Sequence, residues 1–282
     1  MEARSEAPRR AARLGRSQLL AALCLVAVAN GVTVQIVQEV MASGFWRALG
    51  GSFNVSVVIL AATALGFQLA WTSRKEDPSR VDIALAGVAC LLILLPHRVG
   101  SWMAVALLGF HLLTRSNPSA ATIPAALLFI LVSTSAFWSD IATQLFATPV
   151  LSWDAALGTK VVQLFGSVAT HRGNLIIAEG QAPLVILPGC SSLLVASYAV
   201  LCWATITYAL RPVVRWGDLA GMTAIAALAA LSNGMRLALM TLGETAYKWV
   251  HGFIGTSVFN VSVLVCTAAL AFRMAGVPQS HR

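Results

Sequence analysis

The sequence contains few charged residues. Only 11% of its 282 residues are Asp, Glu, Lys or Arg, whereas 58% are hydrophobic. A soluble domain carries about 25% charged residues, so this composition argues against a soluble protein and indicates several membrane spans. The net charge of +8 does not indicate nucleic-acid binding, because the basic residues stand in short clusters between apolar runs and form no continuous basic surface.

Cysteine is also scarce. The chain has five cysteines, with no CxxC pair and no cysteine–histidine pair at the spacing of zinc ligands. This pattern argues against a disulfide framework and a structural metal site, and we expect neither metal nor cofactor. Four of the cysteines lie inside apolar segments, where small packing residues are common. Cys190 differs, because it follows a Pro-Gly pair at the border of an apolar segment.

Long apolar runs recur along the chain, most of them close to the length of about 17–25 residues that a helix needs to cross a bilayer. We predict an all-α polytopic membrane protein with about eight spans in a single integral membrane domain, 1–282. The third and fourth spans are short and could instead form a re-entrant hairpin. His111, in the fourth, is expected to hydrogen-bond to a neighbouring helix. The predicted spans are 17–37, 53–72, 81–95, 102–114, 122–138, 190–210, 218–240 and 254–272.

Basic residues are unevenly distributed between the loops. With the amino terminus inside, thirteen of the 19 Lys and Arg residues fall on the cytoplasmic side, several of them in a basic tail, 1–16. The positive-inside rule favours this orientation, so we expect both termini in the cytoplasm. The first span also resembles a signal peptide ending at Ala27-Val28-Ala29, but its apolar stretch continues to Val37, which favours an uncleaved anchor.

One long segment, 139–189, separates the fifth and sixth spans and is expected outside the cytoplasm. Its middle part carries apolar residues at helical spacing, which predicts an amphipathic helix on the membrane surface. These residues are Leu157, Val161, Leu164, Phe165 and Val168. Two apolar runs, 174–177 and 184–187, then predict a β-hairpin whose second strand leads directly to Cys190.

Three residues suited to acyl transfer reach the same predicted membrane face. Cys190 would open the sixth span, where helix-terminal N–H groups and the helix dipole favour a thiolate. Arg236 lies near the outer end of the seventh span, with Asn233 one turn earlier to orient it. His251 precedes the last span, and His171 is the alternative base. A nucleophile, a charge stabiliser and a proton shuttle at one boundary predict an acyl-transfer site.

Four short motifs occur in a characteristic order between 155 and 272. They are His171-Arg172-Gly173-Asn174, Cys190-Ser191-Ser192, Asn233-Gly234-Met235-Arg236 and His251-Gly252 with Gly255. In order and spacing they resemble the exosortase/archaeosortase family of polytopic transpeptidases. The chain departs from that family at Ser192, where glycine is usual, and at Gly189, where an acidic residue or alanine often precedes the cysteine.

The resemblance implies a membrane cysteine protease or transpeptidase that cleaves C-terminal sorting signals from exported proteins through a thioester. It implies substrates with a C-terminal transmembrane segment and transfer to a cell-surface acceptor. The family's proposed catalytic residues correspond to Cys190, Arg236 and His251, with Asn233 and Ser191 in support. The implied location is the bacterial plasma membrane, with the active site on the extracytoplasmic face.

Two other classes of function remain alternatives. A small-molecule transporter would commonly show repeated halves and ionisable groups near the bilayer midplane, whereas the polar residues of this chain gather at one face. A non-catalytic scaffold of polysaccharide export would share the sequence features of the enzyme.

Overall fold

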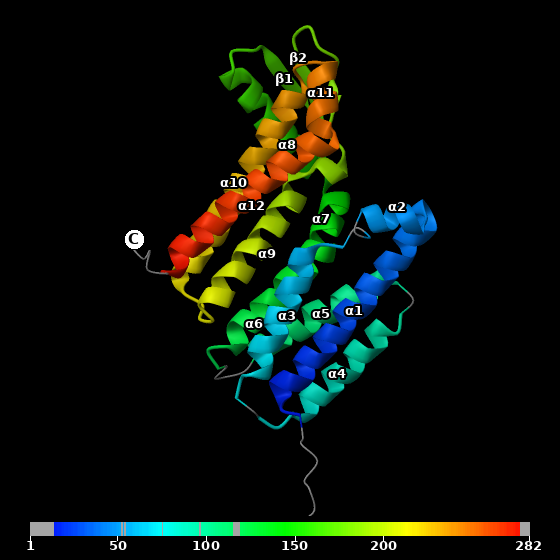
Figure 1. Cartoon of the computed structure of the whole chain (residues 1–282), viewed down its shortest axis with the longest axis vertical. Helices are drawn as coiled ribbons and strands as arrows, with labels where there is room; N and C mark the ends of the chain where they lie inside the picture. Colours follow the sequence, from blue (N-terminus) through cyan, green and yellow to red (C-terminus); the bar gives the residue numbers. More distant parts are fainter. Residues whose placement is uncertain are drawn as a thin grey trace, which may run out of the picture.

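The computed structural model describes residues 14–276, apart from 52, 54, 75, 96 and 115–118. It is mainly helical, with a three-stranded sheet at one end of a helical body (Figure 1). We call the end with the sheet the sheet end. Most of the predicted basic tail lies outside the described residues, as do Lys75, Arg115 and Arg282.

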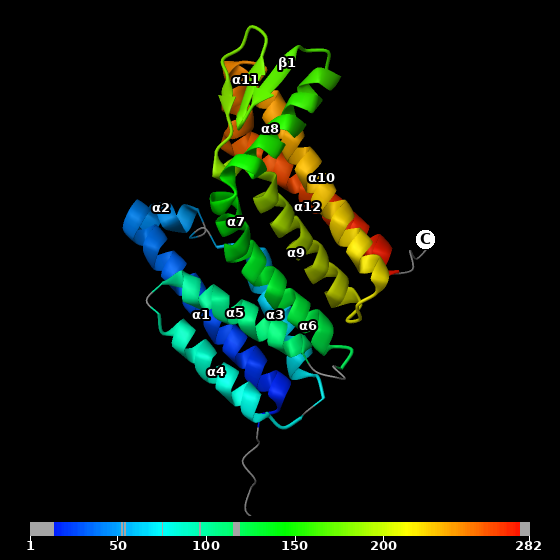
Figure 2. The same ribbon diagram turned by 180° about the vertical axis from the view of Figure 1, so that it is seen from behind.

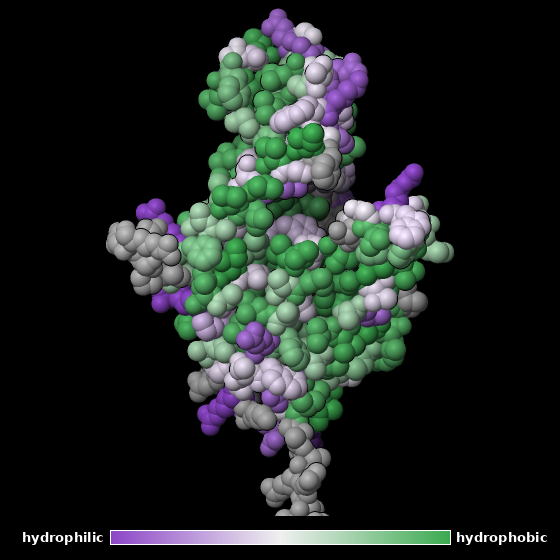
Figure 3. All heavy atoms as spheres, in the orientation of Figure 1, coloured by the Kyte–Doolittle hydropathy of each residue, from purple (hydrophilic) through white to green (hydrophobic). Residues whose placement is uncertain are grey.

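Among the described residues, four helices are long and apolar enough to cross a membrane. They are α1 (Arg16–Ser43), α9 (Ser192–Leu210), α10 (Trp216–Met240) and α12 (Phe253–Ala275). In Figure 3, hydrophobic residues cover most of the helical body, and hydrophilic residues lie mainly towards its ends. An exterior this apolar favours lipid over water as its surroundings.

The remaining apolar segments form shorter helices. They are α3 (Val57–Trp71), α4 (Arg80–Ile93), α5 (Arg98–Leu113) and α6 (Thr122–Ser133). The helix α6 continues through the π-helix η2 (Thr134–Trp138) into α7 (Ser139–Leu145). A short helix, α2 (Phe45–Gly50), follows α1. Each predicted span therefore contains a helix. The 14 residues of α4 extend only about 21 Å, less than the roughly 30 Å of a hydrocarbon core. Eight spans and their orientation stay predictions.

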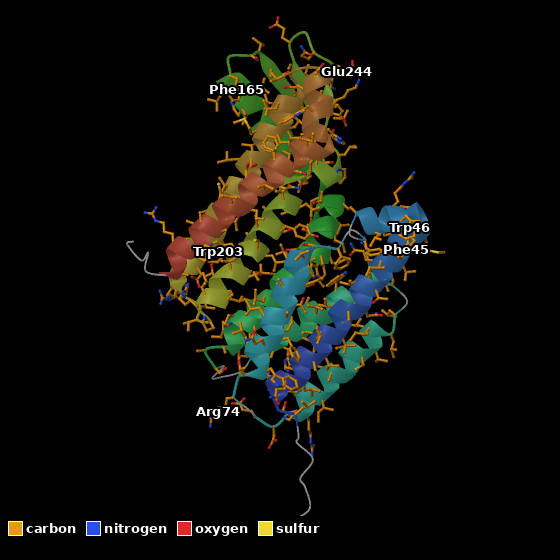
Figure 4. All side chains as sticks on the ribbon, viewed as in Figure 1. Phe45, Trp46, Arg74, Phe165, Trp203 and Glu244 are labelled. Carbon is orange, nitrogen blue, oxygen red and sulfur yellow. The ribbon has the colours of Figure 1, made fainter. Side chains whose placement is uncertain are left out.

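The helical body is held by close packing of apolar side chains. The helix α1 packs against α3, α4 and α5, and α9 packs against α3, α10 and α12. Trp102, Phe129 and Trp203 are among the largest fully buried side chains, and Trp203 lies inside the body in Figure 4. These contacts fix the position of α9, whose first residues belong to the site described below.

Polar side chains join α1, α4 and α5 at the end opposite the sheet. Asp82 accepts a hydrogen bond of 2.7 Å from Nε of Arg16 and lies 2.7 Å from Nε2 of His111. Arg16 also donates to the main-chain oxygen of His111 at 2.8 Å. His111 therefore contacts a neighbouring helix, as predicted. We call Arg16, Asp82 and His111 the buried ion cluster.

The segment before α9 forms the sheet end. It contains α8 (Ala147–Leu164), β1 (Ala169–Arg172), β2 (Leu175–Ala178), β3 (Leu184–Val185) and the 3₁₀ turn η3 (Pro188–Cys190). Antiparallel pairing of β2 with β3 gives the predicted hairpin. The strand β1, which the sequence did not predict, pairs with the other side of β2. The order β1-β2-β3 leaves β3 at an edge of the sheet.

The helix α8 differs from the predicted amphipathic helix. It ends at Leu164 because the chain turns at Gly166, with φ of +82°, to begin β1. Val161 is buried, whereas Leu164 and Phe165 are 84% and 64% exposed (Figure 4). The apolar residues that the sequence assigned to one face are therefore divided. The buried face of α8 packs against α10, β1 and β2.

Candidate active site

Cys190 is the last residue of η3, between β3 and α9. Its main-chain N–H donates to the main-chain oxygen of Leu187 at 2.8 Å, which closes the turn. Its half-buried side chain packs against an apolar cluster from α8, the β2–β3 region, α10 and α11. The buried members of that cluster are Leu151, Ala155, Ile176, Ile186, Leu237, Met240 and Val250. All five cysteines of the chain are free thiols.

The prediction that Cys190 opens the helix is wrong. The helix α9 begins at Ser192, and Ser191 is its N-cap. Ser191 Oγ accepts from the N–H of Leu193 at 3.2 Å, and the N–H of Ser192 donates to a carboxylate oxygen of Asp154 at 3.1 Å. The first two N–H groups of α9 are therefore used by other side chains and do not point at the sulfur. Pro188 and the following glycine favour a separate turn before the helix.

Asp154 of α8 is a site residue that the sequence interpretation missed. It is only 4% exposed and lies against the start of α9. Burial raises the pKa of Asp154, and hydrogen bonds from Ser192 and Ser191 partly oppose that effect. The available signal was a lone acidic residue among the apolar positions of an amphipathic helix.

Two glycines allow α8 to pack closely against β2 and α10. A Cβ atom at Gly158 would lie 2.7 Å from Cδ1 of Ile176, and one at Gly234 would lie 2.8 Å from Cγ of Leu157. Both distances are too short for a packed interior. Gly234 therefore has a packing role within the motif that contains Asn233 and Arg236.

Asn233 holds the turn, and among the described residues no hydrogen bond joins it to Arg236, contrary to the prediction. Its Nδ2 donates to the main-chain oxygen of Cys190 at 2.8 Å and to Ser192 Oγ at 3.2 Å. The residue is 3% exposed, so these bonds are shielded from solvent. Together with Asp154, Asn233 fixes the backbone that directly follows the thiol.

Arg236, three residues further along α10, contacts α12. Its Nη2 donates to Thr256 Oγ1 at 3.2 Å, and the Thr256 hydroxyl donates to the main-chain oxygen of His251 at 3.3 Å. Nε of Arg236 is buried and has no hydrogen-bond partner among the described residues. No described acidic side chain forms an ion pair with Arg236. Its guanidinium therefore retains unused donors.

His251 ends α11 (Glu244–His251) and has an exposed side chain. Its ring stacks on Tyr247, with ring centroids 5.3 Å apart and planes at 20°. Val250, its neighbour, belongs to the apolar cluster that Cys190 touches. A Cβ atom at Gly255 would lie 2.4 Å from the main-chain oxygen of Trp249, so glycine is needed where α12 starts against α11.

Cys190 packs against the cluster that contains Leu237 and Val250, which are the sequence neighbours of Arg236 and His251. Within the described part of the chain, no hydrogen bond joins Sγ of Cys190 to the guanidinium or the imidazole. His171 lies on β1 opposite Ile176, and no described hydrogen bond links it to Cys190, Arg236 or His251. Across the described residues, no group of three or more His, Cys, Asp or Glu side chains could hold a metal ion.

Two cavities adjoin η3. The first, the bundle cavity, has a volume of about 340 Å³ and lies among α3, α9 and α12. Its lining is mainly apolar and includes Gly189 and Thr267. The second, the sheet cleft, has a volume of about 560 Å³ between the 181–187 segment and the α10–α11 region, including Leu187 and Tyr247. Leu187 and Gly189, which precede Cys190 in the sequence, therefore line different cavities.

Comparison with known proteins gave one match. A family model described as transmembrane exosortase matches residues 46–268, which include η3, α9, α10, α11 and most of α12. No curated protein and no solved structure matches the chain.

Proposed function

The chain belongs to the transmembrane exosortase family, and on this basis we propose that it is a cysteine transpeptidase that cleaves exported proteins beside a C-terminal membrane segment. The observation that carries the proposal is a half-buried thiol packed against Leu237 and Val250, which are the sequence neighbours of a guanidinium with unused donors and of an exposed imidazole. These groups supply a nucleophile, a charge stabiliser and a proton carrier.

The reaction has two steps. Sγ of Cys190 gives its proton to His251 and attacks the scissile carbonyl carbon. The C–N bond then breaks, the imidazolium returns the proton to the leaving amine, and a thioester remains. In the second step water or a cell-surface amine attacks the thioester, and the thiol is released. Arg236 stabilises the oxyanion in both steps with donors that are not used in the resting structure.

The backbone contacts at η3 favour this chemistry by limiting movement of the nucleophile. Asn233 binds the carbonyl of Cys190, and Asp154 binds the N–H of Ser192. A nucleophile held in place before the substrate arrives loses less entropy in the transition state. Asn233 and Ser191 thus support the site through the backbone.

The bundle cavity supports binding of the substrate's membrane segment. Its walls include Val195, Ala199, Val263 and Leu264, and it reaches η3 at Gly189. Apolar side chains of a substrate helix would enter it from the bilayer and hold the cleavage site beside the thiol. In this arrangement the sheet end faces away from the cytoplasm.

Trapping of the thioester tests this function. The full-length protein is recovered from cells under acidic conditions, and adducts on Cys190 are identified by mass spectrometry before and after hydroxylamine treatment. We expect a hydroxylamine-sensitive adduct with the new carboxyl end of an exported protein. Cys90→Ala, at an exposed cysteine of α4, is the control and should retain the adduct. Absence of the adduct in the wild type, or its persistence in Cys190→Ala, contradicts the proposal and favours the scaffold.

A further inference from the structure

The strand β3 has an unpaired edge. The N–H of Ile186 donates to the main-chain oxygen of Asn174, so Ile186 bonds towards β2. Leu184, opposite Ile176, has the same orientation. Since N–H and C=O directions alternate along a strand, Val185 directs both groups away from β2. Among the described residues, no backbone hydrogen bond satisfies these groups of Val185.

This free edge belongs to one wall of the sheet cleft. Pro183, Leu184, Val185 and Leu187 line one side of the cleft, and the other side is formed by α10 and α11. The two views of the ribbon agree, because α11 lies in front of the sheet in Figure 1 and behind it in Figure 2. The volume of about 560 Å³ is within the range of about 300–1,000 Å³ that is usual for binding pockets.

The cleft also leads to the two proposed catalytic groups. Leu187, which lines the cleft, is separated from Cys190 only by Pro188 and Gly189. Its main-chain oxygen accepts a hydrogen bond from the N–H of Cys190 and so closes η3. Tyr247 lines the opposite wall and stacks on His251. A chain that lies along β3 is therefore directed towards the thiol and the imidazole.

We propose that the sheet cleft binds the cleavage motif of the substrate as an extended peptide that adds a strand to β3. Main-chain hydrogen bonds to Val185 supply much of the affinity, and alternate side chains of the peptide enter the cleft. This inference rests on the proposed function and specifies how the substrate is recognised. The bundle cavity and the sheet cleft then bind consecutive parts of one substrate, with the scissile bond between them.

The walls of the cleft indicate which side chains it accepts. Met240, Leu184 and Tyr247 provide apolar and aromatic surface. Glu244 is the one acidic residue among these lining side chains, and its carboxylate pairs with Lys248 at 2.6 Å. Glu244 lies at the first turn of α11, near the far end of the molecule in Figure 4. We expect uncharged, small or apolar residues in the motif positions that face this wall.

The test removes one outward N–H while leaving the sheet intact. Val185→Pro lacks that donor, and proline is tolerated on an edge strand where its nitrogen faces away from the ladder. Val185→Thr keeps the donor and the branched shape. The assay uses the full-length protein, and its substrate is the exported protein recovered on Cys190. We expect Val185→Pro to process this substrate about tenfold more slowly than wild type, and also more slowly than Val185→Thr, which retains the donor.

A second measurement covers the case in which Val185→Pro fails to fold. A photoreactive amino acid at position 185 keeps the backbone donor, and the same group at Thr170 on β1 is the control. Irradiation of cells should link position 185, but not position 170, to the substrate residues just before its membrane segment. Equal crosslinking at both positions, or normal processing by folded Val185→Pro, contradicts strand addition to β3 but leaves the proposed function standing. Loss of the Cys190 adduct in the wild type overturns the proposed function as well.

Discussion

Arg16 and Arg236 both lie near helix ends, yet their surroundings differ. Arg16 is 5% exposed and binds Asp82 and the main-chain oxygen of His111. Arg236 binds one threonine hydroxyl, and its buried Nε has no described partner. A buried charge without compensation is costly, so the unused donors of Arg236 need another explanation than stability. The comparison separates an arginine that is paired with a carboxylate inside the protein from one whose buried Nε has no described partner.

The largest effect is expected at the thiol of Cys190. Cys190→Ala should reduce processing by about 10³-fold or more, because the variant lacks the covalent nucleophile. The half-buried side chain contributes only about 1 kcal/mol of packing, so the protein should remain folded. Immunoblots of the uncleaved substrate measure the loss, with Cys24→Ala as a control at a buried cysteine. Normal processing by Cys190→Ala would refute the assignment.

Arg236→Lys is the next strongest test. Lysine keeps the charge but loses the planar set of donors, and loss of an oxyanion donor costs about 10²-fold in rate. Processing should fall by about that factor, with little change in the melting temperature. Arg16→Lys is the matched control. It should process substrate normally and melt at a lower temperature. Slower processing by Arg16→Lys, together with normal processing by Arg236→Lys, would contradict the roles given to the two arginines.

Asp82→Asn tests the buried ion cluster from the other side. Asp82 accepts from Arg16 and contacts His111, so its neutralisation leaves a buried guanidinium without a counterion. We expect a loss of about 3 kcal/mol in the free energy of unfolding and a normal processing rate per folded molecule. Denaturation in detergent and an assay normalised to folded protein measure the two quantities. A specific loss of processing at unchanged stability would contradict a purely structural cluster.

Asp154→Asn should have the smallest effect and a distinctive pH dependence. The pKa of Asp154 is raised by burial, so its contribution to stability is present below its ordinary value of 3.8 and is lost as the pH rises through the raised value. Asparagine still accepts from the N–H of Ser192 but does not titrate. Melting temperatures across about pH 4–8 should therefore vary less in the variant than in the wild type. Identical pH profiles would show that Asp154 does not titrate in this range.

The sequence predicted the features that depend on neighbouring residues. Apolar runs located the helices, and two apolar runs separated by a turn located the β2–β3 hairpin. The strand β1 was missed because its turn, at Gly173 with φ of +58°, was treated only as part of a motif. The contacts of Asp154 and Asn233 were beyond reach, since their partners in η3 and α9 lie 38 to 43 residues away in sequence. Local patterns identify elements, but such distant contacts depend on how the elements pack.

Thr256 connects α12 to the proposed site through hydrogen bonds. Its hydroxyl joins the guanidinium of Arg236 to the backbone of His251. Only 17% of the apolar window of α12 is buried inside the protein, so most of this helix is left for the surrounding lipid. A bilayer that is too thick or too thin changes the tilt of such a helix. We therefore expect the spacing between Arg236 and the backbone of His251 to change with membrane thickness.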